Sequence, residues 1–387
     1  MSPEINKMAL GARPSPTMGA AAAGTSHPDP ISLAVGEPSD APAPEIVAAA
    51  ERAARDGLTR YGAVPGLKEL RETLAKDHEE RYGIQTTIEN VVVTAGGKPA
   101  LIDAMRCILE PGDEVVVPLP AWPTFLDQPR WCGGEGIGVP ATADLLPDPA
   151  AVAEACSDRA KILLINSPGN PTGRVWPEER MKAMVDLAID RDLWILSDEV
   201  YRSLSLIGPP PQPLSVAPEA ADRTIVVTSF SKQFSMTGYR IGSAIGPAAL
   251  ISAITHLMST AVTHASMLSQ YAALAALHLD GTWETTRLAR HRRCRNLAAT
   301  TLDAIDGISL EASESGLYAF PDASEWITDA GFQDDAALCA MLREDYGLML
   351  VPGSAFGSPG RFRLSWCIDE ARLEEALGRL KQARAGR

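Results

Sequence analysis

The middle of the chain alternates short apolar runs with segments of helical periodicity. The apolar runs lie at residues 91–94, 114–119, 161–165, 193–196 and 224–228, and each has the length of a buried strand. Strands that alternate with helices form βαβ units, which build a mostly parallel sheet with helices on both faces. We therefore predict an α/β fold whose main part is a three-layer α/β/α domain. In such a domain the functional site lies at the carboxyl ends of the strands.

The chain has 387 residues, which exceeds what a single hydrophobic core usually supports. We predict a large domain over residues 46–284 and a smaller α+β domain formed by residues 29–45 together with 285–387. In the smaller domain, residues 316–320 and 361–366 have the pattern of strands.

Residues 1–28 are rich in Ala, Gly, Ser and Pro and lack the continuous apolar segment of a cleaved secretory signal. We expect a flexible N-terminal tail, able to order over a site or over a partner subunit. The sequence also has no apolar run long enough to span a bilayer, which argues against a membrane partner.

Composition and charge exclude several classes of function. The formal net charge of −14 argues against a general nucleic-acid surface. The six cysteines are scattered without a CxxC pair, which fits a reducing compartment and predicts a cytoplasmic protein. The six histidines show no metal-binding spacing, so we predict no metal site.

Polar signals follow several of the predicted strands. Gly96 and Gly97 come after the first strand and before a helical pattern, so backbone N–H groups there could bind an anion, although such a pair also forms a plain turn. Trp122 lies beyond the second strand and either stacks on a planar ring or packs in the core. Asp198 follows the fourth strand, as a site carboxylate or as a helix cap.

A single lysine, Lys232, comes just after the fifth predicted strand. Lysine is costly to bury unless its amine is bonded, and a Schiff base with an aldehyde is one such bond. Ser229, Ser231 and Arg240 would then supply donors for a nearby phosphate. The alternative is a solvated lysine in a strand-end loop.

Four motifs follow one another in a fixed order. They are residues 166–173 (Asn-Ser-Pro-Gly-Asn-Pro-Thr-Gly), 197–201 (Ser-Asp-Glu-Val-Tyr), 229–232 (Ser-Phe-Ser-Lys) and 238–242 (Gly-Tyr-Arg-Ile-Gly). The series resembles the aspartate aminotransferase family of class I and II aminotransferases, which are pyridoxal-phosphate enzymes of fold type I. The similarity covers essentially the whole chain beyond the tail and includes residues 31–38, 61, 111–114, 351–354 and 363–365.

The resemblance implies a role for each residue around the ring of the cofactor, pyridoxal 5'-phosphate. Lys232 would hold the cofactor as an aldimine and then move the proton at the substrate Cα. Asp198 would pair with the pyridinium nitrogen and keep it protonated. Asn170 and Tyr201 would donate hydrogen bonds to the phenolic oxygen, and Trp122 would stack on the ring.

The resemblance also implies how the phosphate and the substrate are held. Tyr61 is similar to a tyrosine that reaches the phosphate of the partner subunit, which implies a homodimer with shared active sites. Arg363 would clamp the substrate α-carboxylate in bidentate fashion, a geometry that lysine does not reproduce. Gly36 lies in the segment that closes over that carboxylate. Asn170 would be a further substrate-binding residue. The phosphate ligands would be the backbone N–H groups of Gly97 and Lys98 with Ser229, Ser231 and Arg240.

Three features depart from the family pattern or have no counterpart in its motifs. Ala121 stands where many relatives have Tyr, which changes the space at the edge of the ring. His264 lies in a segment near the partner's site and either faces a substrate or is a surface residue before a helix. The run from Arg290 to Arg293 has the pattern of an exposed helix face, without a motif that assigns it to a dicarboxylate.

Two functions remain open on this scaffold. The first is an aminotransferase that moves the amino group of an L-amino acid to a 2-oxo acid. The alternative is a lyase or synthase of specialised metabolism that performs elimination, replacement or cyclisation of an amino acid. Both need the same lysine, aspartate, asparagine and arginine, and one fold hosts many chemistries. A cofactor-binding regulator is disfavoured, because no catalytic position is missing and no DNA-binding domain is appended.

Overall fold

The computed structural model describes residues 5–10 and 15–386. Its largest element is a seven-stranded sheet with the strand order β2-β8-β7-β6-β5-β3-β4. Neighbouring strands are parallel except at β8, which is antiparallel to both β2 and β7. This mostly parallel sheet confirms the predicted α/β class. The strands are β2 (Val91–Thr94), β3 (Glu114–Pro118), β4 (Glu135–Val139), β5 (Ala160–Ile165), β6 (Trp194–Asp198), β7 (Thr224–Ser229) and β8 (Gly242–Ile245).

Helices cover both faces of this sheet and complete the three predicted layers. Because successive residues of a strand point to opposite faces, Val92 packs in one hydrophobic cluster while Val91 and Val93 pack in another. Helices α5 and α11 lie on the Val92 face, and α4, α7, α8 and α12 lie on the opposite face. These helices are α4 (Lys68–Tyr82), α5 (Gly97–Ile108), α7 (Pro149–Ala155), α8 (Glu178–Asp190), α11 (Ala248–Ala261) and α12 (Met267–Leu277).

The apolar runs form strands because both faces of the sheet are covered. β2 and β3 are buried along their whole length, as expected for Val-rich strands with helices on each side. Two strands lack such a run and were not expected from the sequence. β4 lies at the sheet edge, is partly exposed and contains two glycines, and β8 begins with a glycine.

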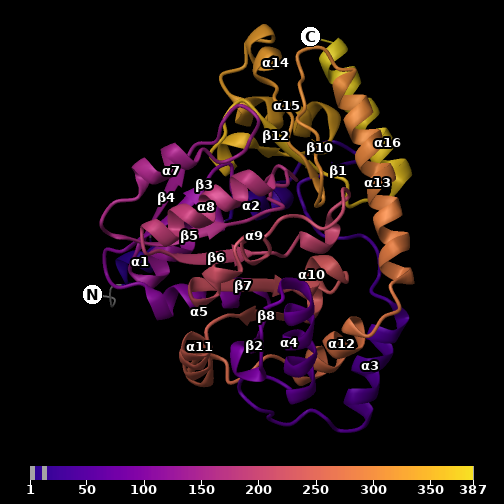
Figure 1. The fold of residues 1–387 in the computed structure, drawn as a ribbon. Coiled ribbons are helices and arrows are strands. Elements are labelled where there is room, and N and C mark those ends of the chain that lie inside the picture. The colour runs from indigo at the N-terminus through magenta and orange to yellow at the C-terminus, as the bar shows by residue number, and fades with distance from the viewer. Residues whose placement is uncertain (1–4, 11–14, 387) are drawn as a thin grey trace.

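Two small sheets lie above the large sheet in the view of Figure 1. One is antiparallel with the order β11-β12-β9, and the other is the parallel pair β1 and β10. β9 and β12 fall inside the predicted strands at 316–320 and 361–366 but are shorter. The strands are β1 (Ile31–Ser32), β9 (Tyr318–Ala319), β10 (Leu348–Met349), β11 (Val351–Pro352) and β12 (Phe362–Ser365).

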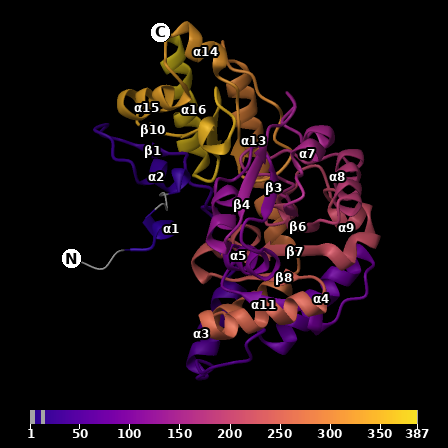
Figure 2. The same ribbon diagram turned by 90° about the vertical axis from the view of Figure 1, so that its left-hand side faces the viewer.

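A separate hydrophobic cluster holds these small sheets against the last helices of the chain. Trp326, Leu342 and Phe362 are fully buried in it, and Ile31 joins it from the N-terminal side. In Figures 1 and 2, α13 and α16 run side by side along this cluster. We propose that this cluster is the core of the small domain over residues 29–45 and 285–387. Its helices are α13 (Thr282–Asp303), α14 (Ser324–Asp329), α15 (Asp335–Tyr346) and α16 (Glu370–Ala385).

The predicted N-terminal tail includes residues 1–4 and 11–14, which lie outside the described residues. Its described part contains two short helices, and the flexibility of the tail stays a prediction. The remaining helices of the described chain are α1 (Lys7–Leu10), α2 (Pro16–Ala22), α3 (Pro44–Arg55), α6 (Thr124–Asp127), α9 (Pro213–Val216) and α10 (Phe230–Gln233).

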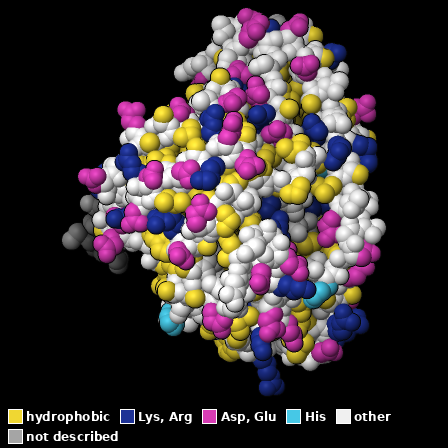
Figure 3. All heavy atoms as spheres, in the orientation of Figure 1, with side chains coloured by type: hydrophobic (Ala, Val, Ile, Leu, Met, Phe, Trp, Pro, Cys, Tyr) yellow, Lys and Arg dark blue, Asp and Glu magenta, His cyan; other side chains and the backbone are white. Residues whose placement is uncertain are grey.

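The surface and the helices can be described in the same terms as the composition. On the face shown in Figure 3, acidic and basic side chains are interspersed rather than gathered in one basic patch. Within residues 5–10 and 15–386, no helix has both the length and the apolar character needed to cross a membrane. No group of three or more His, Cys, Asp or Glu side chains in the same described ranges is arranged to hold a metal ion.

Candidate active site

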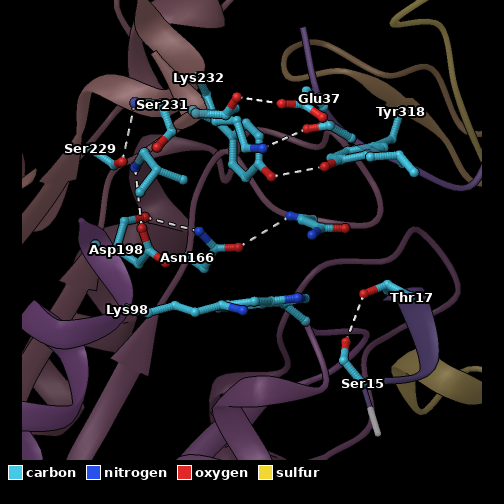
Figure 4. Close-up of a pocket in the computed structure, with 18 of the residues that line it drawn as sticks. Ser15, Thr17, Glu37, Lys98, Asn166, Asp198, Ser229, Ser231, Lys232 and Tyr318 are labelled. Atoms are coloured by element: carbon cyan, nitrogen blue, oxygen red, sulfur yellow. Dashed lines mark hydrogen bonds between the residues drawn. The ribbon is translucent and has the colours of Figure 1, made fainter. Parts of the chain in front are cut away.

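A pocket of about 480 Å³ opens at the carboxyl ends of the central strands. Strands β5, β6 and β7 end at this edge. β2 ends there too, because β2 and β7 are both antiparallel to β8 and therefore run in the same direction. Figure 4 shows side chains that follow strands of the large sheet, and Tyr318 from the small sheet, converging on the same space. The sequence-predicted residues that line it are Gly36, Gly97, Lys98, Trp122, Asn170, Asp198, Tyr201, Ser229, Ser231, Lys232, Arg240 and Arg363.

Lys232 lies in α10, the single helical turn that follows β7. Its amine donates a hydrogen bond of 2.5 Å to the backbone carbonyl oxygen of Gly36. Burial lowers the pKa of the Lys232 amine to about 8. A larger fraction of this amine is therefore unprotonated near neutral pH than of a surface lysine, which makes it a nucleophile and a proton acceptor.

Asp198 ends β6 and is 4% exposed. Its carboxylate accepts a hydrogen bond of 3.2 Å from the backbone N–H of Val200, and the side chain of Asn166 bonds its backbone oxygen. Burial raises the pKa of Asp198 to about 7, because no cationic side chain of the described chain pairs with it. A buried carboxylate that faces a pocket and has no cationic partner in the described chain fits a ligand that brings a positive charge.

An anion cradle forms where α5 begins beside Arg240. Gly96 precedes the helix with a φ of +106°, and a Cβ there would lie 2.7 Å from the Arg240 guanidinium. Arg240 lies 3.5 Å from the Ser231 hydroxyl, and Ser229 lines the same wall. A helix N-terminus with two hydroxyls and a guanidinium suits a phosphate.

The side chain of Lys98 points into the pocket, a feature that the sequence analysis missed because it assigned only the backbone of this residue. The Lys98 amine lies 4.7 Å from the centre of the Trp122 ring, and Figure 4 shows it running along the pocket floor. Burial, and then the charge of Arg240, lower the pKa of the Lys98 amine. No carboxylate of the described chain forms an ion pair with it, so this cation is available to a ligand.

A second guanidinium, that of Arg363, lines the pocket from β12. It is 2% exposed and donates to the side-chain oxygen of Asn170 at 2.9 Å and to the backbone oxygen of Ala34. Its guanidinium carbon lies 4.4 Å from the centre of the Tyr318 ring. This arginine is firmly held and has no carboxylate partner among the described residues, so it is arranged to receive one.

Tyr318 is a site residue that sequence reasoning missed. Its hydroxyl lies 3.0 Å from that of Tyr201, and both side chains are buried. A Cβ at Gly36 would overlap the Tyr318 hydroxyl, so the glycine there is a steric requirement. The available signal was a tyrosine inside a predicted buried strand, because a buried tyrosine hydroxyl needs a polar partner.

The N-terminal helix α2 also reaches the pocket. Ser15, Thr17 and Met18 line it, and the hydroxyls of Ser15 and Thr17 lie 2.9 Å apart (Figure 4). The composition of residues 1–28 suggested a tail able to order over a site, but it did not indicate which residues of the tail would reach the pocket.

Tyr61 alone among the predicted site residues lies outside the pocket, and it is 89% exposed. Its ring meets the edge of His264 at 5.9 Å. Nε2 of His264 accepts a hydrogen bond from the Gly62 N–H at 3.1 Å, and Nδ1 lies 2.7 Å from the Ala265 carbonyl oxygen. Nε2 of His264 thus holds the Tyr61 loop, while Nδ1 is engaged by the neighbouring backbone, and His264 does not line the pocket of its own chain.

The expectation that residues 290–293 form an exposed helix face is wrong in part. Arg292 and Arg293 are exposed, but His291 is buried and Arg290 pairs with Asp40 and the backbone oxygen of Ile368. The reason is that Arg290 and His291 lie on the side of α13 that faces the rest of the protein, where Arg290 meets Asp40 and the backbone of Ile368.

Comparisons with known proteins agree with this geometry. The family model described as "Aminotransferase class I and II" matches residues 28–380. A probable aspartate/prephenate aminotransferase of Thermus aquaticus is 36% identical over 92% of this chain and 91% of its own length. The aspartate aminotransferase of Bacillus subtilis is 33% identical over 92% of this chain and 91% of its own.

Solved structures give the same result. The aspartate aminotransferase of Thermus thermophilus with maleate superposes with a TM-score of 0.90 at 32% identity, covering 98% of this chain and 100% of the other. The aspartate aminotransferase of Rhizobium meliloti superposes with a TM-score of 0.94 at 29% identity and covers 99% of each chain.

Proposed function

Because this chain belongs to the class I and II aminotransferases and is a pyridoxal-phosphate-dependent enzyme, we propose that it moves the amino group of an L-amino acid with an acidic side chain to a 2-oxo acid. One observation carries the proposal. A lysine of lowered pKa, a buried carboxylate without a cation and a buried arginine without a carboxylate share one pocket. These three groups match an amine-reactive aldehyde, a pyridinium nitrogen and a substrate carboxylate.

The residues of the pocket fit pyridoxal 5'-phosphate as a cofactor. Lys232 would bind it covalently, Asp198 would pair with its ring nitrogen, and Trp122 would cover its ring. Asn170 and Tyr201 would donate to its phenolic oxygen. When bound, the cofactor supplies an aldehyde that condenses with amines and a ring that accepts the electron pair released at the substrate Cα. Its phosphate would be held by Gly97, Lys98, Ser229, Ser231 and Arg240.

The chain's own residues account for the handling of the substrate. Arg363 would hold the α-carboxylate with two parallel hydrogen bonds, which fixes the direction of the Cα–H bond. Lys232, once its amine is free, would take the proton from Cα and return it at the other end of the reacting system. Its lowered pKa suits both directions of that transfer.

The side chain of Lys98 supports an acidic substrate. It is a cation that lines the pocket and forms no ion pair with any carboxylate of residues 5–10 and 15–386. Relatives of this chain are named aspartate and aspartate/prephenate aminotransferases, and both named compounds carry two carboxylates. We infer that Arg363 binds the first carboxylate of such a substrate and Lys98 the second.

We further propose a cytoplasmic homodimer with shared active sites. Tyr61 is exposed and fixed by His264, and apolar Leu58 and Val262 are exposed with it, which suits a contact with a second copy of the chain. The tyrosine would then reach the phosphate of the partner's cofactor. All six cysteines are unpaired, which supports a reducing compartment.

A single-turnover assay tests the proposed function. The loaded enzyme is mixed with L-aspartate in the absence of any 2-oxo acid, and the products are followed by absorbance and mass spectrometry. An aminotransferase yields the amine form of the cofactor and one equivalent of the 2-oxo acid, after which turnover stops. Repeated release of another product with no amine form would contradict the proposal and indicate a lyase or synthase. Lys232→Ala is the control that must give neither outcome.

A further inference from the structure

Two tyrosine hydroxyls from different parts of the chain meet inside the pocket. Tyr201 follows β6 of the large sheet, and Tyr318 lies in β9 of the small sheet. Their oxygens are 3.0 Å apart, and their rings meet edge to face with centroids 5.8 Å apart. A buried tyrosine hydroxyl requires a hydrogen-bond partner, and each of these two supplies the other's.

The surroundings of Tyr318 separate the role of its ring from that of its hydroxyl. The ring faces the guanidinium of Arg363 at 4.4 Å, whereas the hydroxyl lies against Gly36. Figure 4 shows Tyr318 entering the pocket from the side opposite Asp198, with its oxygen directed inward. The charged or titratable groups that act on the tyrosine pair are Arg363, Asp198 and Cys367.

Counting protons sets the direction of this hydrogen bond once the cofactor is bound. A hydroxyl carries one proton and two lone pairs. Under the function proposed above, Tyr201 donates its proton to the phenolic oxygen of the cofactor. Tyr201 then has only lone pairs to offer Tyr318, so Tyr318 must be the donor. Hydrogen bonds that follow one another in this way strengthen each other.

We propose that Tyr318 is a positioning residue whose hydroxyl donates to Tyr201, fixes the direction of the Tyr201 proton and makes Tyr201 a stronger donor to the cofactor. This inference rests on the proposed function. A stronger donor draws electron density from the phenolic oxygen, which then holds the proton it shares with the neighbouring nitrogen less tightly. The bound cofactor therefore loses that proton, and changes colour, at a lower pH than it would without Tyr318.

The variant Tyr318→Phe tests this role because it removes the hydroxyl and keeps the ring on Arg363. Wild type, Tyr318→Phe, Tyr201→Phe and the double variant are loaded with cofactor, and the pH midpoint of the colour change is measured by absorbance. We expect Tyr201→Phe to raise the midpoint most. Tyr318→Phe should raise it by about 0.1–0.7 unit, since cooperativity adds about 10–30% to a hydrogen bond. The double variant should match Tyr201→Phe alone.

Two results would overturn the proposal. An unchanged midpoint in Tyr318→Phe means that its hydroxyl does not act on the cofactor. Shifts that add in full in the double variant mean that Tyr318 acts without Tyr201. The matched control is Tyr346→Phe, which removes a tyrosine hydroxyl outside the pocket and should leave the midpoint unchanged.

Two further readings separate this inference from its alternatives. The dissociation constant of maleate should be the same in Tyr318→Phe as in wild type, because the ring that faces Arg363 is retained. Weaker maleate binding with an unchanged midpoint would assign the hydroxyl to the carboxylate site and refute the proposal. A wild type without any cofactor-dependent absorbance would remove the proposed function and this inference together. A wild-type colour change that Tyr318→Phe does not shift would remove this inference alone.

Discussion

The guanidinium of Arg287 donates a hydrogen bond of 2.6 Å to the backbone carbonyl oxygen of Lys232. It donates a second, of 2.5 Å, to the carbonyl oxygen of Gln233. Arg287 is buried on α13, and its charge lies 3.5 Å from Asp40. A helix of the proposed small domain thus holds the turn that carries the lysine.

The variant Arg287→Met is expected to lower the free energy of unfolding by about 2–4 kcal/mol, because it leaves two backbone carbonyls without their donor and removes one of the two arginines beside Asp40. Denaturant unfolding of the cofactor-free protein measures the loss. The control is Arg293→Met on the exposed face of the same helix, where the partner is Glu370 at the surface. That variant should unfold at the wild-type denaturant concentration, and equal losses in both variants would contradict the role of Arg287.

The contribution of Asp198 to the unfolding free energy of the cofactor-free protein should fall as the pH rises from about 4 to about 7, opposite in sign to the contribution of His78 and His291, whose pKa values burial lowers to about 4. Burial raises the pKa of Asp198 in the folded protein to about 7, above the ordinary value of 3.8. The folded chain keeps this proton where the unfolded chain has lost it, so the stabilisation is complete below the lower value and disappears above the higher one. Glu199, whose pKa burial also raises to about 7, contributes in the same range.

The variant Asp198→Asn should flatten this pH dependence and make the cofactor-free protein more stable at pH above 7 than wild type. The same variant should bind the cofactor less tightly, since the positively charged ring nitrogen loses its partner. Unfolding curves at several pH values and a titration with pyridoxal phosphate measure the two effects. An unchanged pH profile would show that Asp198 is not a strained carboxylate in the empty pocket.

The variant Arg363→Lys is expected to weaken binding of the substrate carboxylate by about 1–3 kcal/mol, since an ammonium cannot form two parallel hydrogen bonds to it. The loss should appear in the KM of every amino acid tested and in the dissociation constant of maleate. If KM stays the same for all substrates, Arg363 is not the carboxylate clamp.

The variant Lys98→Met is expected to lower kcat/KM for L-aspartate by about 10- to 100-fold, which corresponds to the loss of one charge-assisted hydrogen bond. Amino acids without a second carboxylate should be affected much less. The ratio of kcat/KM for L-aspartate to that for an aromatic amino acid is the decisive quantity. Lys76→Met, on the exposed face of α4, is the matched control, and a uniform loss across substrates would refute this assignment of Lys98.

The variant His264→Ala should loosen the Tyr61 loop, because the Gly62 N–H loses its acceptor. If Tyr61 serves the partner's cofactor, the variant should bind pyridoxal phosphate more weakly while its own pocket stays intact.

The shared site itself is tested with a mixed dimer of Lys232→Ala and Tyr61→Ala, in which one of the two sites keeps both residues. Activity in the mixture but in neither parent supports the shared site, and a monomer in sedimentation would exclude it.

The sequence predicted those parts of the fold and site that depend on local patterns. Apolar runs marked β2, β3, β5, β6 and β7, because strands buried on both faces are built mainly from apolar residues. The weak strands β4 and β8 were missed, since glycines and an exposed edge remove that signal.

Among the site residues, those within the four motifs fall in the pocket, whereas Tyr318, Ser15 and Thr17 were not anticipated. These residues come from distant segments that reach the pocket only through tertiary packing. The side chain of Lys98 was missed for a related reason, because a backbone role does not reveal where a long flexible side chain will lie.

The hydrogen bond from the Lys232 amine to the Gly36 carbonyl has a consequence for ligand binding at this lysine. A free lysine amine donates to the Gly36 carbonyl through one of its N–H protons. When the amine nitrogen is bonded covalently to a ligand, it loses most of these protons. Each time Lys232 is occupied, the carbonyl of Gly36 therefore needs another donor, and each time Lys232 is released, that donor must leave. The hydrogen bonding of residues 31–38 therefore depends on the chemical state of Lys232. This segment pairs with β10 through Ile31. We therefore expect occupancy of the Lys232 amine and the conformation of residues 31–38 to be thermodynamically linked.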